Sequence, residues 1–135
     1  MMPAHLLSTL PSFLAYFGVA LVLLALFLLI YLNVTPYHEV ALIRAGNIAA
    51  AVSLSGALLG FAMPVANVIA HSDTLVDLAS WGAIALVIQI LAYLATRLAL
   101  PHLNEDIPAG RIAPATLLAV VSLSIGLINA ACMSY

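Results

Sequence analysis

Four long apolar stretches, separated by short polar connections, constrain this sequence more than any other feature. They cover residues 11–32, 47–70, 75–98 and 112–133. Each reaches the roughly 20 residues that an α-helix needs to cross about 30 Å of hydrocarbon. Membrane-spanning strands would be about half as long and would alternate between apolar and polar residues. The pattern therefore predicts an all-α membrane protein with four transmembrane helices.

The composition fits a chain that is surrounded mainly by lipid. Hydrophobic residues make up 66% of the 135 residues and charged residues 6%, and the mean hydropathy is +1.24. Soluble domains carry about 25% charged residues, so this chain has too few polar residues to cover a core in water. We interpret residues 1–135 as a single integral membrane domain. The net charge of −2, with three arginines and no lysine, excludes a nucleic-acid-binding surface.

The first apolar stretch has some features of a secretory signal peptide. However, residues 1–10 contain no Lys or Arg, and the stretch exceeds the about 7–15 apolar residues of a signal-peptide core. No small-residue cleavage site follows it. We expect a retained transmembrane helix.

The short connections carry the signals of helix ends. Thr35 followed by Pro36 resembles an N-cap with proline at the first helical position, which predicts a short interfacial helix over residues 36–45. Thr74 and Asp77 have the spacing of a capping box at the start of the third long helix.

The arginines predict the orientation in the membrane. They lie in the first connection and on both flanks of the third, and the positive-inside rule therefore places both termini in the periplasm. The charged residues expected in cytoplasmic loops are Glu39, Arg44, Arg97 and Arg111. Aromatic belts would consist of Tyr16, Trp81 and Tyr135 at the outer interface and Tyr31, Tyr37 and Tyr93 at the inner one.

The two halves of the chain resemble each other. Residues 45–49 read AGNIA and residues 109–113 read AGRIA, each just before an apolar stretch. This predicts two tandem helical-hairpin repeats, over residues 11–70 and 75–133 approximately. Because both hairpins start and end on the same side, the repeats are parallel, unlike the inverted repeats of many transporters.

Two matched stripes of small and polar residues follow the second and fourth long helices. Their members recur at offsets of 4, 7, 11, 14 and 18 residues, which keeps them on one helical face. Lipid provides little hydrophobic drive between helices, so small residues matter because they let backbones approach closely. We expect these two helices to pack closely, with each other or across a subunit boundary. The interface residues predicted are Ala49, Ser53, Gly56, Gly60, Ala119, Ser122, Gly126 and Asn129.

Pro64 lies inside the second long helix and cannot donate a hydrogen bond to the carbonyl group of Gly60. A kink is therefore predicted there. We favour a bend that improves packing, and a hinge that moves during gating is the alternative.

Gln89 lies near the centre of the third apolar stretch. An amide in hydrocarbon needs hydrogen-bond partners, which favours a bond to a Ser or Asn on a neighbouring helix. The alternative is a polar pore lined by Gln89, Asn129, Ser122 and Ser124.

No recognisable catalytic or metal-binding motif is present. Ionisable side chains avoid the middle of the apolar stretches, which counts against a proton-coupled pump. Pairs such as His38 with Glu39 and His102 with Glu105 lack a metal-binding spacing, and we interpret them as solvated loop residues. We expect no enzymatic activity, no cofactor and no metal. We expect Cys132 to be buried, with an intersubunit disulfide as the alternative.

Four segments resemble a known family of bacterial inner-membrane proteins. They are residues 35–39 (TPYHE), 47–51 (NIAAA), 81–89 (WGAIALVIQ) and 129–133 (NAACM). The sequence is similar to the YjfL-type proteins of the domain-of-unknown-function 350 group, also called uncharacterised protein family 0719. The resemblance covers nearly the whole chain. It implies paired-helix repeats, the inner membrane of a Gram-negative bacterium and a link to membrane-stress proteins of the phage-shock type, but no known activity or functional residues.

Three hypotheses for function follow from these observations. The preferred one is a non-enzymatic membrane scaffold that forms homo-oligomers and serves envelope or membrane-stress adaptation, with membrane lipid and membrane-stress proteins of the phage-shock type as the expected partners. The second is a small oligomeric channel or transporter for ions or small solutes such as polyamines. An intramembrane enzyme ranks last because no nucleophile–base pair can be named.

Overall fold

The structure is a computed structural model that describes residues 4–133, with side chains from residue 7 onward. Every regular element in this part of the chain is helical. The helices are α1 (Ala4–Val34), α2 (Glu39–Arg44), α3 (Ile48–His71), α4 (Leu75–Ala99), α5 (Leu103–Asp106) and α6 (Ile112–Cys132). Within residues 4–133, α1, α3, α4 and α6 are long and apolar enough to cross a membrane. The prediction of four such helices is confirmed.

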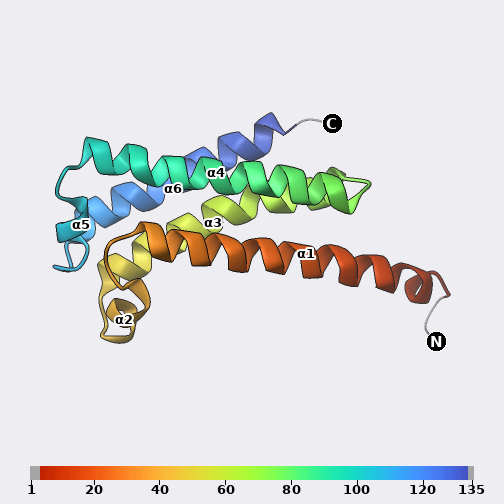
Figure 1. Cartoon of the computed structure of the whole chain (residues 1–135), viewed down its shortest axis with the longest axis horizontal. Helices are drawn as coiled ribbons and strands as arrows, with labels where there is room; N and C mark the ends of the chain where they lie inside the picture. The colour runs from red at the N-terminus through yellow and green to blue at the C-terminus, as the bar shows by residue number, and fades with distance from the viewer. Residues whose placement is uncertain (1–3, 134–135) are drawn as a thin grey trace.

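The four long helices run along the length of the molecule (Figure 1). The turn between α3 and α4, the start of α1 and the end of α6 lie at one end, which we call the turn end. The short helices α2 and α5 lie at the opposite end, which we call the α2–α5 end. Each long helix therefore passes once between two ends that carry the connections.

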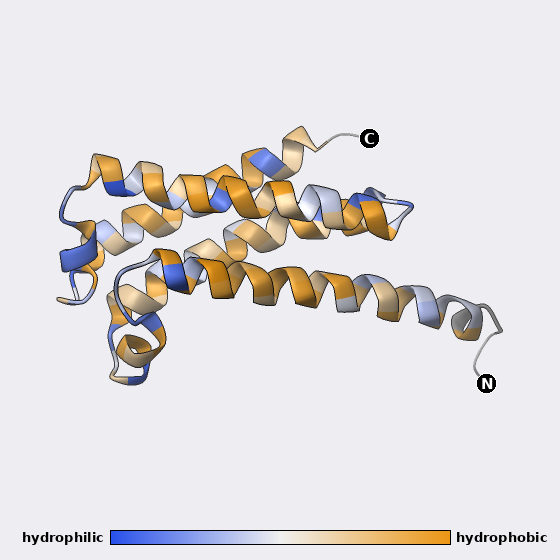
Figure 2. Ribbon diagram, viewed as in Figure 1, coloured by the Kyte–Doolittle hydropathy of each residue, from blue (hydrophilic) through white to orange (hydrophobic). Residues whose placement is uncertain are grey.

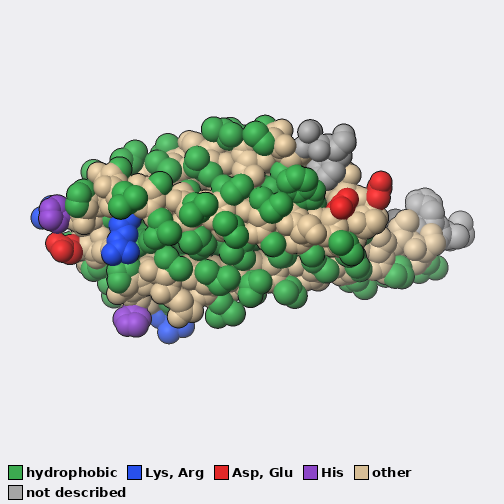
Figure 3. Space-filling view, turned by 45° about the horizontal axis from the view of Figure 1, so that its top comes forward, with side chains coloured by type: hydrophobic (Ala, Val, Ile, Leu, Met, Phe, Trp, Pro, Cys, Tyr) green, Lys and Arg blue, Asp and Glu red, His purple; other side chains and the backbone are tan. Residues whose placement is uncertain are grey.

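Polar residues concentrate at these two ends. Figure 2 shows that the sides of the long helices are mainly hydrophobic, while the most hydrophilic stretches lie in the connections. Figure 3 shows hydrophobic side chains along the middle of one face, with arginine and histidine at one end and acidic groups at both ends. This distribution matches an apolar membrane interior between two aqueous interfaces.

The closest helix pair in the bundle is α3 with α6. A Cβ atom added at Gly126 would collide with the backbone of Gly60, and one added at Gly60 would collide with the carbonyl group of Ser122. One turn away along α3, a Cβ at Gly56 would collide with Ala119. The glycines therefore let the two backbones touch, as the spacing of small residues requires.

The first helix packs on α3 and α4. Leu23 fills the space over Gly82 of α4, where an added Cβ would lie 2.5 Å from a Leu23 methyl group. Phe27 stacks on Phe61 of α3, with 4.6 Å between ring centroids. Only 11% of the most apolar stretch of α1 is buried, against 50% in α3 and 33% in α4 and α6. Most of α1 therefore faces outward.

The ends of the short helix α2 differ from the prediction. It covers Glu39–Arg44 with His38 at the N-cap position, so the predicted start at Pro36 is wrong. Thr35 lies three residues before this N-cap position and does not cap the helix; its hydroxyl group donates a hydrogen bond to the side chain of Glu39. At the start of α4, Thr74 does cap the helix, with its Oγ1 accepting from the backbone N–H of Asp77 at 3.1 Å.

Candidate functional site

The polar residue at the centre of the bundle, Gln89, points between helices. Its Nε2 donates to the backbone carbonyl oxygen of Ser122 at 3.1 Å, close to Gly60, and both Gln89 and Ser122 are buried. Asn129 is also buried, whereas Ser124 is exposed on the surface of α6. The structure thus brings Gln89 and Ser122 together and leaves Ser124 apart from them.

Two asparagines connect α3 to the second half of the chain near both of its ends. Asn47 caps α3 by accepting from the backbone N–H of Ala50 at 3.0 Å, and its Nδ2 donates to the carbonyl oxygen of Ile107 at 3.0 Å. Near the turn end, Asn67 Nδ2 donates to the carbonyl oxygen of Ala130 at 2.8 Å. These bonds fix the two ends of α3 against α6 and the α5–α6 connection, while the bond of Gln89 joins α4 to α6.

The predicted interface stripes lie against each other within one chain. All eight residues are buried, namely Ala49, Ser53, Gly56, Gly60, Ala119, Ser122, Gly126 and Asn129. Pro64 is also buried, within a continuous α3. A contact between subunits would therefore have to use other faces of the chain.

The most unusual group in the structure is the carboxyl group of Glu39. Its side chain is only 1% exposed, although it begins the short helix α2 at the membrane interface. Thr35 Oγ1 donates to Glu39 Oε1 at 2.6 Å, while Oε2 has no hydrogen-bond partner in the part of the chain that the structure describes. The prediction that Glu39 is a solvated loop residue is wrong. Glu39 is buried because α2 turns back toward the ends of the long helices, so that the first residue of α2 faces the core.

Three tyrosines surround this carboxyl group instead of facing lipid. Tyr31 and Tyr93 pack edge to face with 5.6 Å between ring centroids, and Tyr37 lies buried beside them. The hydroxyl groups of Tyr31 and Tyr37 are buried without a hydrogen-bond partner among the described residues. The predicted inner aromatic belt is therefore wrong for these residues, because their rings fill the space between α1, α4 and the connections. We call Tyr31, Thr35, Tyr37, Glu39 and Tyr93 the Glu39 cluster.

On one side, hydrogen bonds through Asn104 link the Glu39 cluster to a charged residue. The amide of Asn104 lies 2.7 Å from the hydroxyl group of Tyr93. In the orientation that satisfies both neighbours, Asn104 Nδ2 donates to Tyr93 and Oδ1 accepts from Arg97 Nε at 2.8 Å. Asn104 thus connects the buried cluster to a guanidinium group at the surface.

Burial changes the acidity of the groups in this cluster that lie outside the long helices. It raises the pKa of Glu39 from its usual 4.5 to about 7, although the hydrogen bond from Thr35 acts in the opposite direction. Burial, and secondly the charge of Glu39, also raise the pKa of Tyr37. A carboxyl group with this pKa can gain or lose a proton near neutral pH.

The three arginines lie at helix ends, in or beside the connections where they were predicted. Arg44 ends α2, Arg97 lies in the last turn of α4, and Arg111 is the N-cap residue of α6. Arg111 Nη1 lies 3.5 Å from Asp106 Oδ1, and of this pair the arginine is exposed while the aspartate is half-buried. Among the described residues, no three His, Cys, Asp or Glu side chains come together in a way that could hold a metal ion.

Cys132 is exposed on α6, so the prediction of a buried thiol is wrong. Tyr16 and Trp81 are partly buried against the core, and Tyr135 lies outside the described residues.

The Glu39 cluster was missed although the sequence contains a signal for it. Tyr31, Thr35 and Glu39 are spaced four residues apart, which would place them on one face of a continuous helix. Pro36 obscured this pattern by suggesting a new helix start. The contribution of Tyr93, which is distant in the sequence, has no such local signal.

Four apolar helices of membrane-spanning length, with polar side chains turned inward, define an all-α multi-pass membrane protein. The chain belongs to the family described as Domain of Unknown Function (DUF350), whose family model matches residues 5–133. It is 37% identical over 131 residues to the UPF0719 inner membrane protein YjfL of Escherichia coli K12, covering 97% of this chain and 99% of that protein. It is 30% identical over 92 residues to the UPF0719 transmembrane protein YshE of Bacillus subtilis 168, covering 68% of this chain and 69% of that protein. The resemblance noted from the sequence is confirmed, and no solved structure matches.

Proposed function

We propose that this protein is a non-enzymatic scaffold of the bacterial inner membrane that assembles with further copies of itself. The inner membrane is the location stated in the name of the Escherichia coli relative. The observation that carries the proposal is the exposure of α1, a membrane-spanning helix of which the rest of the chain covers very little.

The exposed face of α1 offers a continuous apolar surface to a second copy. Val22, Leu26 and Leu29 are all exposed and lie at offsets of 4 and 7 residues, the spacing of a helix–helix seam. The small-residue stripes of α3 and α6 are already used within the chain. Assembly through α1 therefore leaves the internal packing of each copy unchanged.

The oligomer can be tested by native mass spectrometry of protein in lipid nanodiscs. We expect dimers or larger assemblies, and we expect Leu26→Trp on α1 to reduce them. Val120→Trp, at an exposed position on α6, is the matched control and should leave them unchanged. If only monomers were detected at all protein-to-lipid ratios, the proposed self-assembly would be wrong.

We also propose that the bundle consists of two parallel hairpin repeats. In support, the connection before α3 and the connection before α6 share an unusual backbone. Gly46 and Gly110 both have positive φ angles, of 89° and 80°, and each directly precedes the N-cap residue of a long helix. A short helix comes before each glycine.

The proposed role in envelope or membrane-stress adaptation extends the family resemblance to this chain. Proteins of the phage-shock type are the proposed partners. A deletion strain exposed to membrane-perturbing agents should lose viability relative to its parent. If the deletion strain and its parent survived equally, and no phage-shock-type protein could be cross-linked to this chain in vivo, the proposed role would be wrong.

A small channel or transporter for ions or small solutes is the second candidate, and the Glu39 cluster favours it. A buried ionisable group at a membrane interface is a common feature of ion and proton pathways. Flux measurements on proteoliposomes distinguish the two functions. Ion or polyamine flux that Glu39→Gln abolishes would support the channel, and the absence of flux would support the scaffold.

A further inference from the structure

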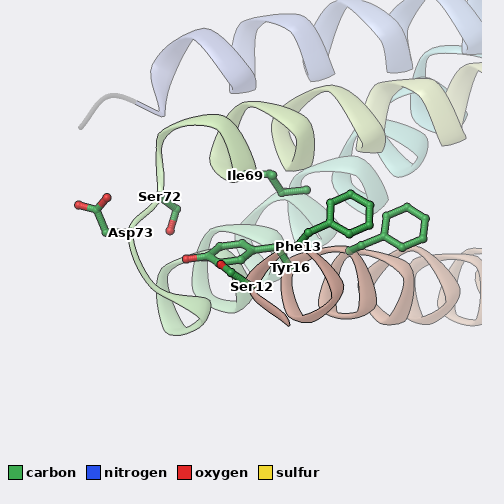
Figure 4. A pocket seen from close by; sticks show the side chains of 7 residues that line it. Ser12, Phe13, Tyr16, Ile69, Ser72 and Asp73 are labelled. Atoms are coloured by element: carbon green, nitrogen blue, oxygen red, sulfur yellow. The ribbon is translucent and has the colours of Figure 1, made fainter. Parts of the chain in front are cut away.

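A pocket opens near the turn end, between residues 12–17 of α1 and the end of α3 with the turn that follows it (Figure 4). Its volume is about 470 Å³, which is within the range of small-molecule sites. The pocket and the Glu39 cluster lie at opposite ends of the molecule, because the cluster is at the α2–α5 end. Neither the sequence motifs nor the packing of α3 on α6 accounts for it.

The pocket changes from polar to apolar with depth. Figure 4 shows Ser72 and Asp73 on the α3–α4 turn and the hydroxyl group of Tyr16 directed toward that turn, while Phe13 and Ile69 lie further along the helices. Phe17, one turn deeper on α1 than Phe13, stacks on it with 5.6 Å between ring centroids and an interplanar angle of 8°. Both phenylalanines are largely exposed. A ligand in this pocket would meet polar groups at the interface and aromatic rings inside the membrane.

We propose that this pocket binds a phospholipid with an amine headgroup, from the leaflet on the side of the α3–α4 turn. One acyl chain lies along the rings of Phe13 and Phe17 and the side chain of Ile69. The headgroup ammonium lies against the carboxylate of Asp73. The hydroxyl group of Ser12 donates to the phosphate.

Charge favours an amine headgroup over an anionic one. Asp73 lines the pocket, whereas all three arginines belong to the opposite end of the molecule. The hydroxyl group of Ser72 already donates to the carbonyl oxygen of Thr74 at 2.8 Å, so it can only accept from a ligand. A headgroup with a net negative charge would be repelled by the Asp73 carboxylate, while an ammonium group would neutralise it.

Native mass spectrometry of the full chain can test this site. The protein is released from mixed micelles that contain equal amounts of phosphatidylethanolamine and phosphatidylglycerol with the same acyl chains. We expect about a threefold excess of the phosphatidylethanolamine adduct, as one partly exposed ion pair would give. Asp73→Asn should remove this preference. Asp77→Asn makes the same charge change at the same end, outside the pocket lining, and should retain it.

A second variant tests the apolar part of the pocket. Phe13→Ala should reduce the adducts of both lipids, while Leu21→Ala, at an exposed position deeper on α1, should not. Equal adducts of the two lipids in the unchanged protein, or equal effects of Asp73→Asn and Asp77→Asn, would overturn the proposal. A dimer that forms in place of the lipid-bound monomer, and that Phe13→Ala abolishes, would also overturn it, because a second copy would then occupy the pocket.

Discussion

At Glu39, burial of the side chain disfavours the charged form of its carboxyl group. The side chain has a single hydrogen-bond partner, Thr35, and its second carboxyl oxygen is buried without one among the described residues. The ionised form is therefore costly, which is why the pKa rises to about 7. The four-residue spacing from Tyr31 to Thr35 to Glu39 could have indicated this cluster. The sequence does not show that the chain bends after Thr35 and turns α2 inward.

Glu39→Gln should change how stability depends on pH. The folded state binds a proton more tightly than the unfolded state, so the contribution of Glu39 is fully present below the unfolded pKa of 4.5. It is lost as the pH rises through about 7. The loss is on the order of 3 kcal/mol, because one pKa unit corresponds to about 1.4 kcal/mol. Unfolding measured in bicelles at pH 5 and pH 8 should show this loss in the unchanged protein and not in Glu39→Gln.

Glu105→Gln is the control for that measurement. Glu105 lies in α5 at the same end of the molecule, and its side chain is 83% exposed. This variant should lose stability between pH 5 and pH 8 as the unchanged protein does. If Glu39→Gln and Glu105→Gln gave parallel curves, Glu39 would not be the group that titrates.

Gln89→Leu should have only a small effect on stability. The variant loses the hydrogen bond to Ser122, but it also removes Oε1, which is buried without a partner among the described residues. Interhelical hydrogen bonds in membranes contribute about 0.6 kcal/mol on average, so we expect a change below about 1 kcal/mol. Steric-trapping measurements in bicelles provide the value. A loss several times larger would show that Gln89 belongs to a wider polar network.

Among the helices, the pair α3 and α6 was the most accessible to sequence reasoning. The matched offsets of small residues identified the two faces, because close backbone approach in lipid depends on such residues. The same pattern could not tell whether the partner helix belongs to the same chain. Both alternatives satisfy the spacing, and only the three-dimensional path of the connections decides between them. In the structure, Gly60 meets Gly126 within one chain.

Gly126→Ala should strongly destabilise the bundle. The added methyl group would collide with the backbone of Gly60, which cannot move without separating α3 from α6. Overpacking of this kind costs about 1–3 kcal/mol. Gly18→Ala is the matched control, since nothing lies within 4 Å of its added Cβ in α1. It should be neutral or stabilising by up to about 1 kcal/mol through helix propensity. Unfolding in mixed detergent micelles measures both, and equal effects would contradict the close contact.

For the whole molecule, hydrophobicity predicted the number of long helices but not how they are arranged. The four apolar stretches correspond to α1, α3, α4 and α6 within a few residues, except that α1 begins at Ala4 and includes Pro11. The peripheral position of α1 was not predicted, because a lipid-facing side chain and a buried one can be equally apolar, although the most apolar stretch of α1 is clearly more hydrophobic than those of the other three long helices. The inward-facing tyrosines were missed for a related reason, since a tyrosine near an interface fits both an aromatic belt and a buried cluster.

The distribution of charge over the two ends predicts the orientation of the whole molecule. Arg44, Arg97 and Arg111 all belong to the α2–α5 end, and the turn end carries Asp73 and Asp77. The positive-inside rule concerns arginine and lysine near the membrane and gives little weight to acidic residues. We therefore expect the α2–α5 end to lie in the cytoplasm and the turn end in the periplasm.

Cysteine labelling tests this orientation directly, because the chain has a single native cysteine. In a Cys132→Ser background, Asp73→Cys at the turn end should react with a membrane-impermeant maleimide in intact spheroplasts. Glu105→Cys at the α2–α5 end should react only after the membrane is opened. Both positions are exposed, so access to water does not separate them. The reverse pattern would show that three arginines are too few to set the topology and that another signal determines it.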